Sequence, residues 1–163
     1  MIKIRKNVFE TNSSSTHSVT FNSDSPLSSL DPNIEINEEG YITVRPEGFC
    51  SWCNYVDQQS KLAYIIQLCA YCNDIYFSSW NSAERRIAAE NLYETEMFKE
   101  IEDEIISYVG SEYKGIRLDI DYDSGYIDDG HDYNSVQEFL DEEGMSLIEF
   151  IFGDTLLHYE YNG

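Results

Sequence analysis

The sequence predicts an α+β fold in which a small antiparallel or mixed sheet packs with two main helices and short C-terminal helices, in a single domain over residues 1–163. Strand-like segments occur in the first, middle and last parts of the chain, and helical spacing fills the intervals between them, which is typical of α+β proteins. The length of 163 residues and the 42% hydrophobic content suit one hydrophobic core.

The first two predicted strands flank a polar segment. Residues 1–9 alternate apolar Ile2, Ile4 and Val8 with basic side chains, and residues 17–21 return to β-branched and aromatic side chains. The intervening segment is rich in Ser, Thr and Asn, which favours a loop or turn.

A hairpin is expected after a surface loop over residues 22–33, which contains Ser, Asp and Pro. Residues 34–37 and 41–44 alternate around a turn at Gly40, and Pro46 ends the second strand. We expect the first third of the chain to form a small antiparallel sheet, with the serine-rich loop at its edge or end.

Two main helices follow. The first begins after Asp57, a plausible N-cap, and ends near residue 74. Its apolar residues form one stripe: Leu62, Ile65, Ile66 and Cys69. The second begins at Asn81, with Glu84 at capping-box spacing, and ends at Gly110, either as one continuous helix or with a break.

A third group of strands begins at residues 115–122, which alternate as a half-buried strand. This alternation places Asp119, Asp121 and Asp123 on one face. Residues 155–161 predict the last strand.

Two short helices are predicted between these strands. Ser135 with Glu138, and Ser146 with Glu149, each have the spacing of a capping box and precede apolar residues.

The charge of the chain is strongly negative: 31 acidic against 10 basic residues give a net charge of −21. Residues 90–160 alone hold 21 acidic and 3 basic residues. This field repels nucleic acid and attracts basic surfaces, which in other proteins are commonly nucleic-acid-binding grooves. A nucleic-acid mimic is therefore one interpretation, and an acidic surface that only maintains solubility is the other.

The carboxylates expected to contact a basic partner lie on the second helix and on the strand after it: Glu94, Glu96, Glu100, Glu102, Asp103, Glu104, Asp119, Asp121 and Asp123. A solvated helix face is the alternative interpretation of the helical ones.

The polar segment near the N-terminus offers a second type of site. Its hydroxyls and backbone N–H groups can surround a phosphate: Thr11, Asn12, Ser13, Ser14, Ser15 and His17. In an enzymatic version, His17 and Glu10 would transfer protons, with His131 as a further candidate. Turn chemistry of Ser, Thr and Asn explains the same residues without a ligand.

Two further patterns could hold a metal. Cys50, Cys53, Cys69 and Cys72 have the CxxC, fifteen residues, CxxC spacing of a four-thiolate zinc site, although core cysteines explain the second pair equally well. A second group of oxygen and nitrogen donors could bind a divalent cation or form a polar turn: Asp128, Asp129, His131 and Asp132.

The segment FETNSSSTHS at residues 9–18 resembles the opening of a family of small uncharacterised proteins encoded by phages and prophages of Gram-positive bacteria. The KLAYII, GYID and SLIEFIF segments are also similar to that family. In the family pattern a His follows GYID closely, whereas here Asp129 and Gly130 precede His131. The resemblance implies a phage setting and a shared fold, and it implies no mechanism.

The leading functional prediction is a non-enzymatic phage protein that inhibits a nucleic-acid-handling or defence enzyme of the bacterial host, in the manner of a DNA- or RNA-mimicking anti-CRISPR protein. It would act in the host cytoplasm without membrane contact, since no run approaches the roughly 20 apolar residues of a membrane span and the N-terminus has no apolar signal core. Direct nucleic-acid contact is not expected, because the negative field repels phosphates. The alternative is a protein that sequesters or hydrolyses a nucleotide in the loop of residues 11–17. A structural or virion-associated acidic protein is the third reading.

Overall fold

The computed structural model describes residues 2–4, 15–46, 53–77, 81–121 and 133–161. The helices and strands follow in chain order: β1 (Ile2–Ile4), β2 (Ser15–Asn22), β3 (Ile42–Val44), β4 (Cys53–Tyr55), α1 (Gln58–Cys72), α2 (Ser82–Tyr93), α3 (Glu96–Val109), β5 (Ile116–Leu118), α4 (Val136–Glu143), α5 (Leu147–Phe152) and β6 (Asp154–Tyr161). The α+β class predicted from the sequence is confirmed.

The main sheet joins segments that are far apart in the chain. Its strand order is β1-β2-β6-β4, and the pairs are antiparallel. β2 and β6 pair along their whole lengths, from Ser15 opposite Tyr161 to Asn22 opposite Asp154. Val19 and Leu157 lie opposite each other in this register and are buried, so the register places apolar side chains of both strands in the core.

The predicted sheet in the first third of the chain is wrong in one respect, because β3 does not join β1 and β2. β3 pairs with β5 in a separate, parallel, two-stranded sheet. The expected hairpin is reduced to a single bridge between Ile36 and Ile42, with Gly40 at the turn in the left-handed region (φ 92°). Ile42, Val44 and Ile116 are fully buried, so the apolar faces of these short strands decide the pairing.

The predicted strand over residues 115–122 is also shorter than expected. β5 ends at Leu118, and the N–H of Asp119 makes the last bond to β3, 2.8 Å from the carbonyl of Val44. β3 ends before Pro46, which has no N–H to donate. The chain turns at residues 120–121 instead of continuing the strand, and Asp123 of the predicted acidic face lies outside the described residues.

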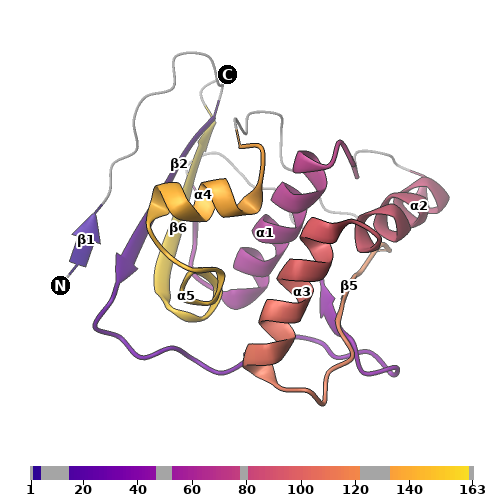
Figure 1. Ribbon diagram of the computed structural model, residues 1–163, viewed down its shortest axis with the longest axis horizontal. Helices are drawn as coiled ribbons and strands as arrows, with labels where there is room; N and C mark the ends of the chain where they lie inside the picture. Colours follow the sequence, from indigo (N-terminus) through magenta and orange to yellow (C-terminus); the bar gives the residue numbers. More distant parts are fainter. Residues whose placement is uncertain (1, 5–14, 47–52, 78–80, 122–132, 162–163) are drawn as a thin grey trace.

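Helix α1 lies in the middle of the molecule, between the main sheet and α3 (Figure 1). It contacts α3, α4, α5 and β3. Asp57 is its N-cap, as predicted, and accepts a hydrogen bond from the N–H of Ser60 at 2.8 Å. The single apolar stripe predicted for this helix understates its burial, since 12 of its 15 residues are buried.

The second predicted helix is broken at Glu94 and Thr95, which separate α2 from α3, so of the two expected alternatives the broken helix is observed. The Thr95 hydroxyl accepts from the N–H of Phe98 and so begins a new helix. Gly110 ends α3 as predicted, with φ of 135°.

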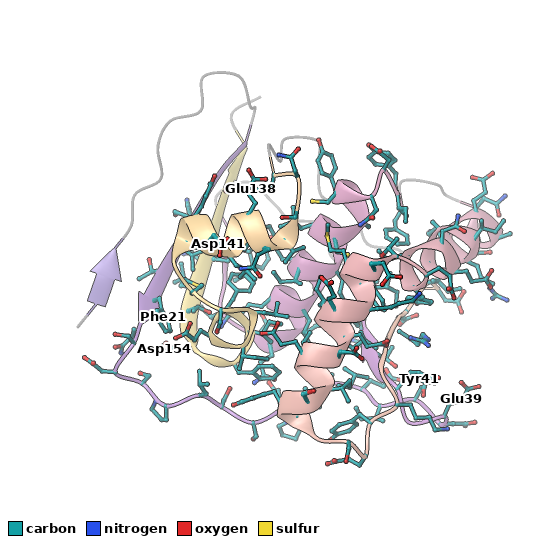
Figure 2. The ribbon with its side chains drawn as sticks, viewed as in Figure 1. Phe21, Glu39, Tyr41, Glu138, Asp141 and Asp154 are labelled. Atoms are coloured by element: carbon teal, nitrogen blue, oxygen red, sulfur yellow. The ribbon has the colours of Figure 1, made fainter. Side chains whose placement is uncertain are left out.

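The two short C-terminal helices have the predicted N-caps. At α5 the capping box is complete, since Ser146 and Glu149 each accept the other's backbone N–H. At α4 the capping box is incomplete. Ser135 accepts from the N–H of Glu138, but the Glu138 carboxylate accepts from the N–H of Asn134 instead of that of Ser135. Figure 2 shows Glu138 and Asp141 on α4.

An aromatic cluster joins three helices in the core. The ring of Phe139 on α4 lies 5.3 Å from Tyr64 on α1 and 5.5 Å from Phe150 on α5, measured between centroids. Within the described ranges, no helix combines the length and the apolar character required to cross a bilayer.

Candidate functional site

The outer face of α3 carries a row of exposed carboxylates. Phe98, Ile101 and Ile105 occupy the inner face and are buried. Helical geometry then directs the intervening acidic side chains outward. The exposed acidic residues of α3 are Glu96, Glu100, Asp103 and Glu104, and Glu90 and Glu94 extend the row onto α2 and the break.

These carboxylates differ in how far they are neutralised. The Lys99 ammonium lies 3.6 Å from the Glu94 carboxylate and 3.7 Å from that of Glu96. Within the described part of the chain, Glu100, Asp103 and Glu104 have neither a hydrogen bond nor an ion pair through their side chains. Charge available to a partner is therefore concentrated in the middle of α3.

Glu102, which was predicted to contact a partner, is instead engaged inside the fold. Its carboxylate oxygen Oε1 accepts the N–H of Ile116 at 2.6 Å and the Arg117 guanidinium at 3.1 Å. Only 20% of its side chain is exposed. Helical spacing grouped Glu102 with the exposed glutamates of α3. It could not predict these contacts, because β5 reaches Glu102 only after the chain reverses direction at Gly110.

Arg117 completes this contact as a cation held between two rings. Its guanidinium carbon lies 4.2 Å from the centroid of Tyr41 and 4.5 Å from that of Tyr93. The Tyr93 hydroxyl oxygen accepts the N–H of Leu118 at 2.9 Å, and burial raises the pKa of this hydroxyl. We call Tyr41, Tyr93, Glu102 and Arg117 the arginine clamp. The sequence analysis did not predict the arginine clamp. The one indication in the sequence was Arg117 itself, a basic residue between two apolar residues in the acidic second half of the chain.

The structure describes the predicted acidic residues after β5 only in part. Asp119 is half-buried and Asp121 is exposed in the turn that follows. Asp123 lies outside the described residues.

Charge density sets a limit on what α3 can imitate alone. Fourteen residues span about 21 Å. The four exposed carboxylates less the Lys99 charge leave roughly one negative charge per 7 Å. A nucleic-acid strand carries about one per 3.4 Å. A mimic based on α3 therefore needs the wider acidic surface of residues 90–160 to match a nucleic acid.

The predicted phosphate loop lies mostly outside the described residues, which exclude Glu10 and residues 11–14. The backbone of Ser15, Thr16 and His17 belongs to β2, opposite Tyr161, Glu160 and Tyr159. The loop is thus shorter at its C-terminal end than predicted. The second donor group, Asp128, Asp129, His131 and Asp132, also lies outside the described residues. His158 on β6 contacts its pairing partner Asn54 on β4 at 2.7 Å between Nδ1 and Oδ1.

Half of the predicted cysteine site can be described. Cys69 is fully buried in α1, and burial raises the pKa of its thiol to about 12. The Cys72 thiol donates to the carbonyl of Tyr133 at 3.4 Å, and burial raises its pKa to about 11. Cys50 and the side chain of Cys53 lie outside the described residues, so zinc binding by the four cysteines stays a prediction.

A cavity of about 370 Å³ lies beside the N-terminus of α1, and the sequence analysis did not anticipate it. It is lined by Asp31, Asp57, Gln58 and Lys61 among others. The Lys61 side chain is 2% exposed, and its Nζ donates to the carbonyl of Gly153, at the end of α5, at 3.2 Å. Desolvation lowers the pKa of Lys61 to about 8, against the opposing attraction of Asp154 and Asp57. The one indication of this contact in the sequence was Lys61 itself, a basic residue directly before the apolar run of α1.

The lowered pKa of Lys61 predicts a specific pH dependence of stability. Between about pH 8 and 10.5 the unfolded chain binds a proton at this residue that the folded chain has lost. The free energy of unfolding therefore rises with pH across this window, and this gain is lost again as the pH decreases from 10.5 to 8. We expect the free energy of unfolding of wild type minus that of Lys61→Met to increase by roughly 1–2 kcal/mol from pH 7 to pH 10.

Urea denaturation of both proteins at several pH values measures this difference. The cysteines and Tyr93 titrate with the opposite sign, since their raised pKa values favour the folded state only at lower pH, but they are present in both proteins and cancel. Parallel stability curves for the two proteins would show that Lys61 is not desolvated as described.

Comparisons with known proteins do not identify a family for this chain. No family model matches the sequence, and neither a curated protein nor a solved structure matches it.

Proposed function

We propose that this chain is a phage-encoded, non-enzymatic acidic protein that occupies a basic, nucleic-acid-binding surface of a bacterial host protein and so inhibits it. The observation that carries this proposal is the middle of α3, where Glu100, Asp103 and Glu104 are exposed and have no ion-pair partner in the described part of the chain. The resemblance of FETNSSSTHS to phage and prophage proteins supports the setting in the host cytoplasm.

Electrostatics favours a protein partner over a nucleic acid. With a net charge of −21, the chain repels phosphates. The same charge accelerates association with a basic surface and suppresses association with acidic ones. Since the four carboxylates of α3 are sparser than phosphates, the proposal requires a partner groove wide enough to contact other acidic segments as well.

Capture from host lysate tests this proposal. Tagged protein is incubated with lysate of the bacterial host at about 0.05 M and about 0.5 M salt, because screening weakens exposed charge attraction over this range. We expect a nucleic-acid-binding protein that is retained at low salt and released by high salt or by added DNA or RNA. The purified partner should then lose nucleic-acid binding when this chain is added.

Two results would contradict the proposal. Retention that is insensitive to salt would indicate an apolar interface. Retention of a nucleotide without a protein partner would favour the alternative function at residues 11–17, and substitution of Ser14, Ser15 and His17 by Ala would then be the next test.

A further inference from the structure

A groove between α3 and α4 combines apolar and acidic side chains. Its volume is about 190 Å³. Its lining includes Met97, Glu100, Ile101 and Glu104 from α3, Leu140 from α4 and Leu147 from α5. The floor is therefore aliphatic, whereas the carboxylates on its α3 side come from two residues one helical turn apart.

The two carboxylates of this groove repel each other. Residues four apart on a helix are neighbours, and like charges there destabilise the helix. No basic side chain of the described residues forms an ion pair with Glu100 or Glu104, although Lys99 pairs with Glu94 and Glu96 nearby. A cation placed between Glu100 and Glu104 would relieve this repulsion.

We propose that this groove is the anchor point of the acidic face and receives an arginine side chain of the basic protein partner. The inference rests on the proposed function and specifies its recognition chemistry. The aliphatic stem of an arginine can lie on Ile101, Leu140 and Leu147, while its guanidinium lies between the two carboxylates.

Arginine fits this groove better than lysine. Its guanidinium is planar, is weakly hydrated and presents five N–H donors in a fixed arrangement, so it can bond to two carboxylates while one face rests on apolar side chains. The ammonium of lysine is strongly hydrated and compact, and its dehydration in a groove with an aliphatic floor is less favourable. Arginine is also enriched at protein interfaces, whereas lysine is depleted.

The thioether of Met97 provides a local probe of the groove. Its sulfur lies 3.8 Å from the Asn73 side-chain nitrogen, and the residue is half-buried beside Glu100 and Ile101. Met145 is 8% exposed and does not line the groove, so its methyl group serves as an internal reference. Selective ¹³C-methyl labelling of methionine makes both signals observable by NMR.

The experiment titrates the intact protein with a hexa-arginine peptide and, separately, with a hexa-lysine peptide. We expect hexa-arginine to shift the Met97 methyl signal more than that of Met145 and to bind at least fivefold more tightly than hexa-lysine. Glu100→Gln and Glu104→Gln should each weaken hexa-arginine binding about tenfold, as expected for loss of a charge-assisted hydrogen bond. Asp103→Asn is the matched control, because it removes one exposed charge from the same helix outside the groove, and it should change the affinity less than twofold.

The outcomes separate the groove from the general acidic face. Salt-sensitive binding with an unchanged Met97 signal, or with equal effects of all three substitutions, would overturn the arginine anchor and leave the proposed function intact. Equal affinity for the two peptides would also overturn it. Absence of binding to either peptide at low salt would overturn both the anchor and the attraction on which the proposed function depends.

Discussion

Reversal of three charges on α3 should weaken binding of the captured host protein by roughly a hundredfold at low salt. The substitutions are Glu100→Lys, Asp103→Lys and Glu104→Lys, at exposed positions that are not paired with a basic residue in the described part of the structure. Each reversal replaces an attraction to a basic surface with a repulsion. Exposed positions on the outer face of a helix tolerate lysine, so the fold should be retained.

The control must carry the same change in net charge at another place. Glu38→Lys, Glu39→Lys and Glu112→Lys alter three exposed residues in turns and also add six units of positive charge. Figure 2 shows Glu39 at the end of the molecule away from α4. Isothermal titration calorimetry of both variants at low and moderate salt compares them. If the control loses as much affinity as the α3 variant, binding follows net charge and α3 is not the contact surface.

Removal of the arginine clamp should produce the largest loss of stability among surface substitutions. Arg117→Ala removes a guanidinium that lies between the Tyr41 and Tyr93 rings and leaves Glu102 without its cation. The pair is partly exposed, at 34% for Arg117 and 20% for Glu102, so we expect a loss of about 2–3 kcal/mol rather than the larger value for a fully buried pair.

Arg117→Lys separates charge from geometry. Lysine retains the charge but cannot lie as a flat group between two rings while bonding to Glu102, so we expect a loss of about 1–2 kcal/mol. Arg86→Ala is the control, because Arg86 is exposed on α2 and should change the free energy of unfolding by less than about 0.5 kcal/mol. Urea denaturation gives these values. Equal stabilities of Arg117→Ala and Arg86→Ala would mean that the clamp does not contribute to the fold.

The elements that the sequence predicted well are those defined by local chemistry. Asp57, Asn81, Ser135 and Ser146 all begin helices as predicted. Thr95 was not predicted as a cap, and the position of the break before α3 was not predicted either. An N-cap requires a side chain and a backbone N–H two or three residues away, so a short window of sequence contains the whole interaction. The same holds for the outward direction of Glu100, Asp103 and Glu104, which follows from helical periodicity.

The features that the sequence could not predict depend on segments that meet only in the folded chain. The pairing of β3 with β5 joins Ile42 to Ile116, and neither three-residue strand has a pattern that identifies its partner. Glu102 looked equivalent to its acidic neighbours because its partners come from β5. β4 was missed for a related reason, since three residues are too few for an alternating pattern.

Assembly of the main sheet also constrains how this protein is made. Among the paired residues of β2 and β6, Asn22 and Asp154 are nearest to each other in the sequence, and 132 positions separate even these two. During synthesis β2 therefore has no access to β6 until residues 154–161 have left the ribosome, whereas α1, α2 and α3 can form from local contacts much earlier. Such long-range strand pairing folds slowly, and the unpaired edge of β2 is open to other strands in the meantime. A nascent chain with a high density of like charges resists that association, so the acidic composition also protects the unfinished sheet during synthesis.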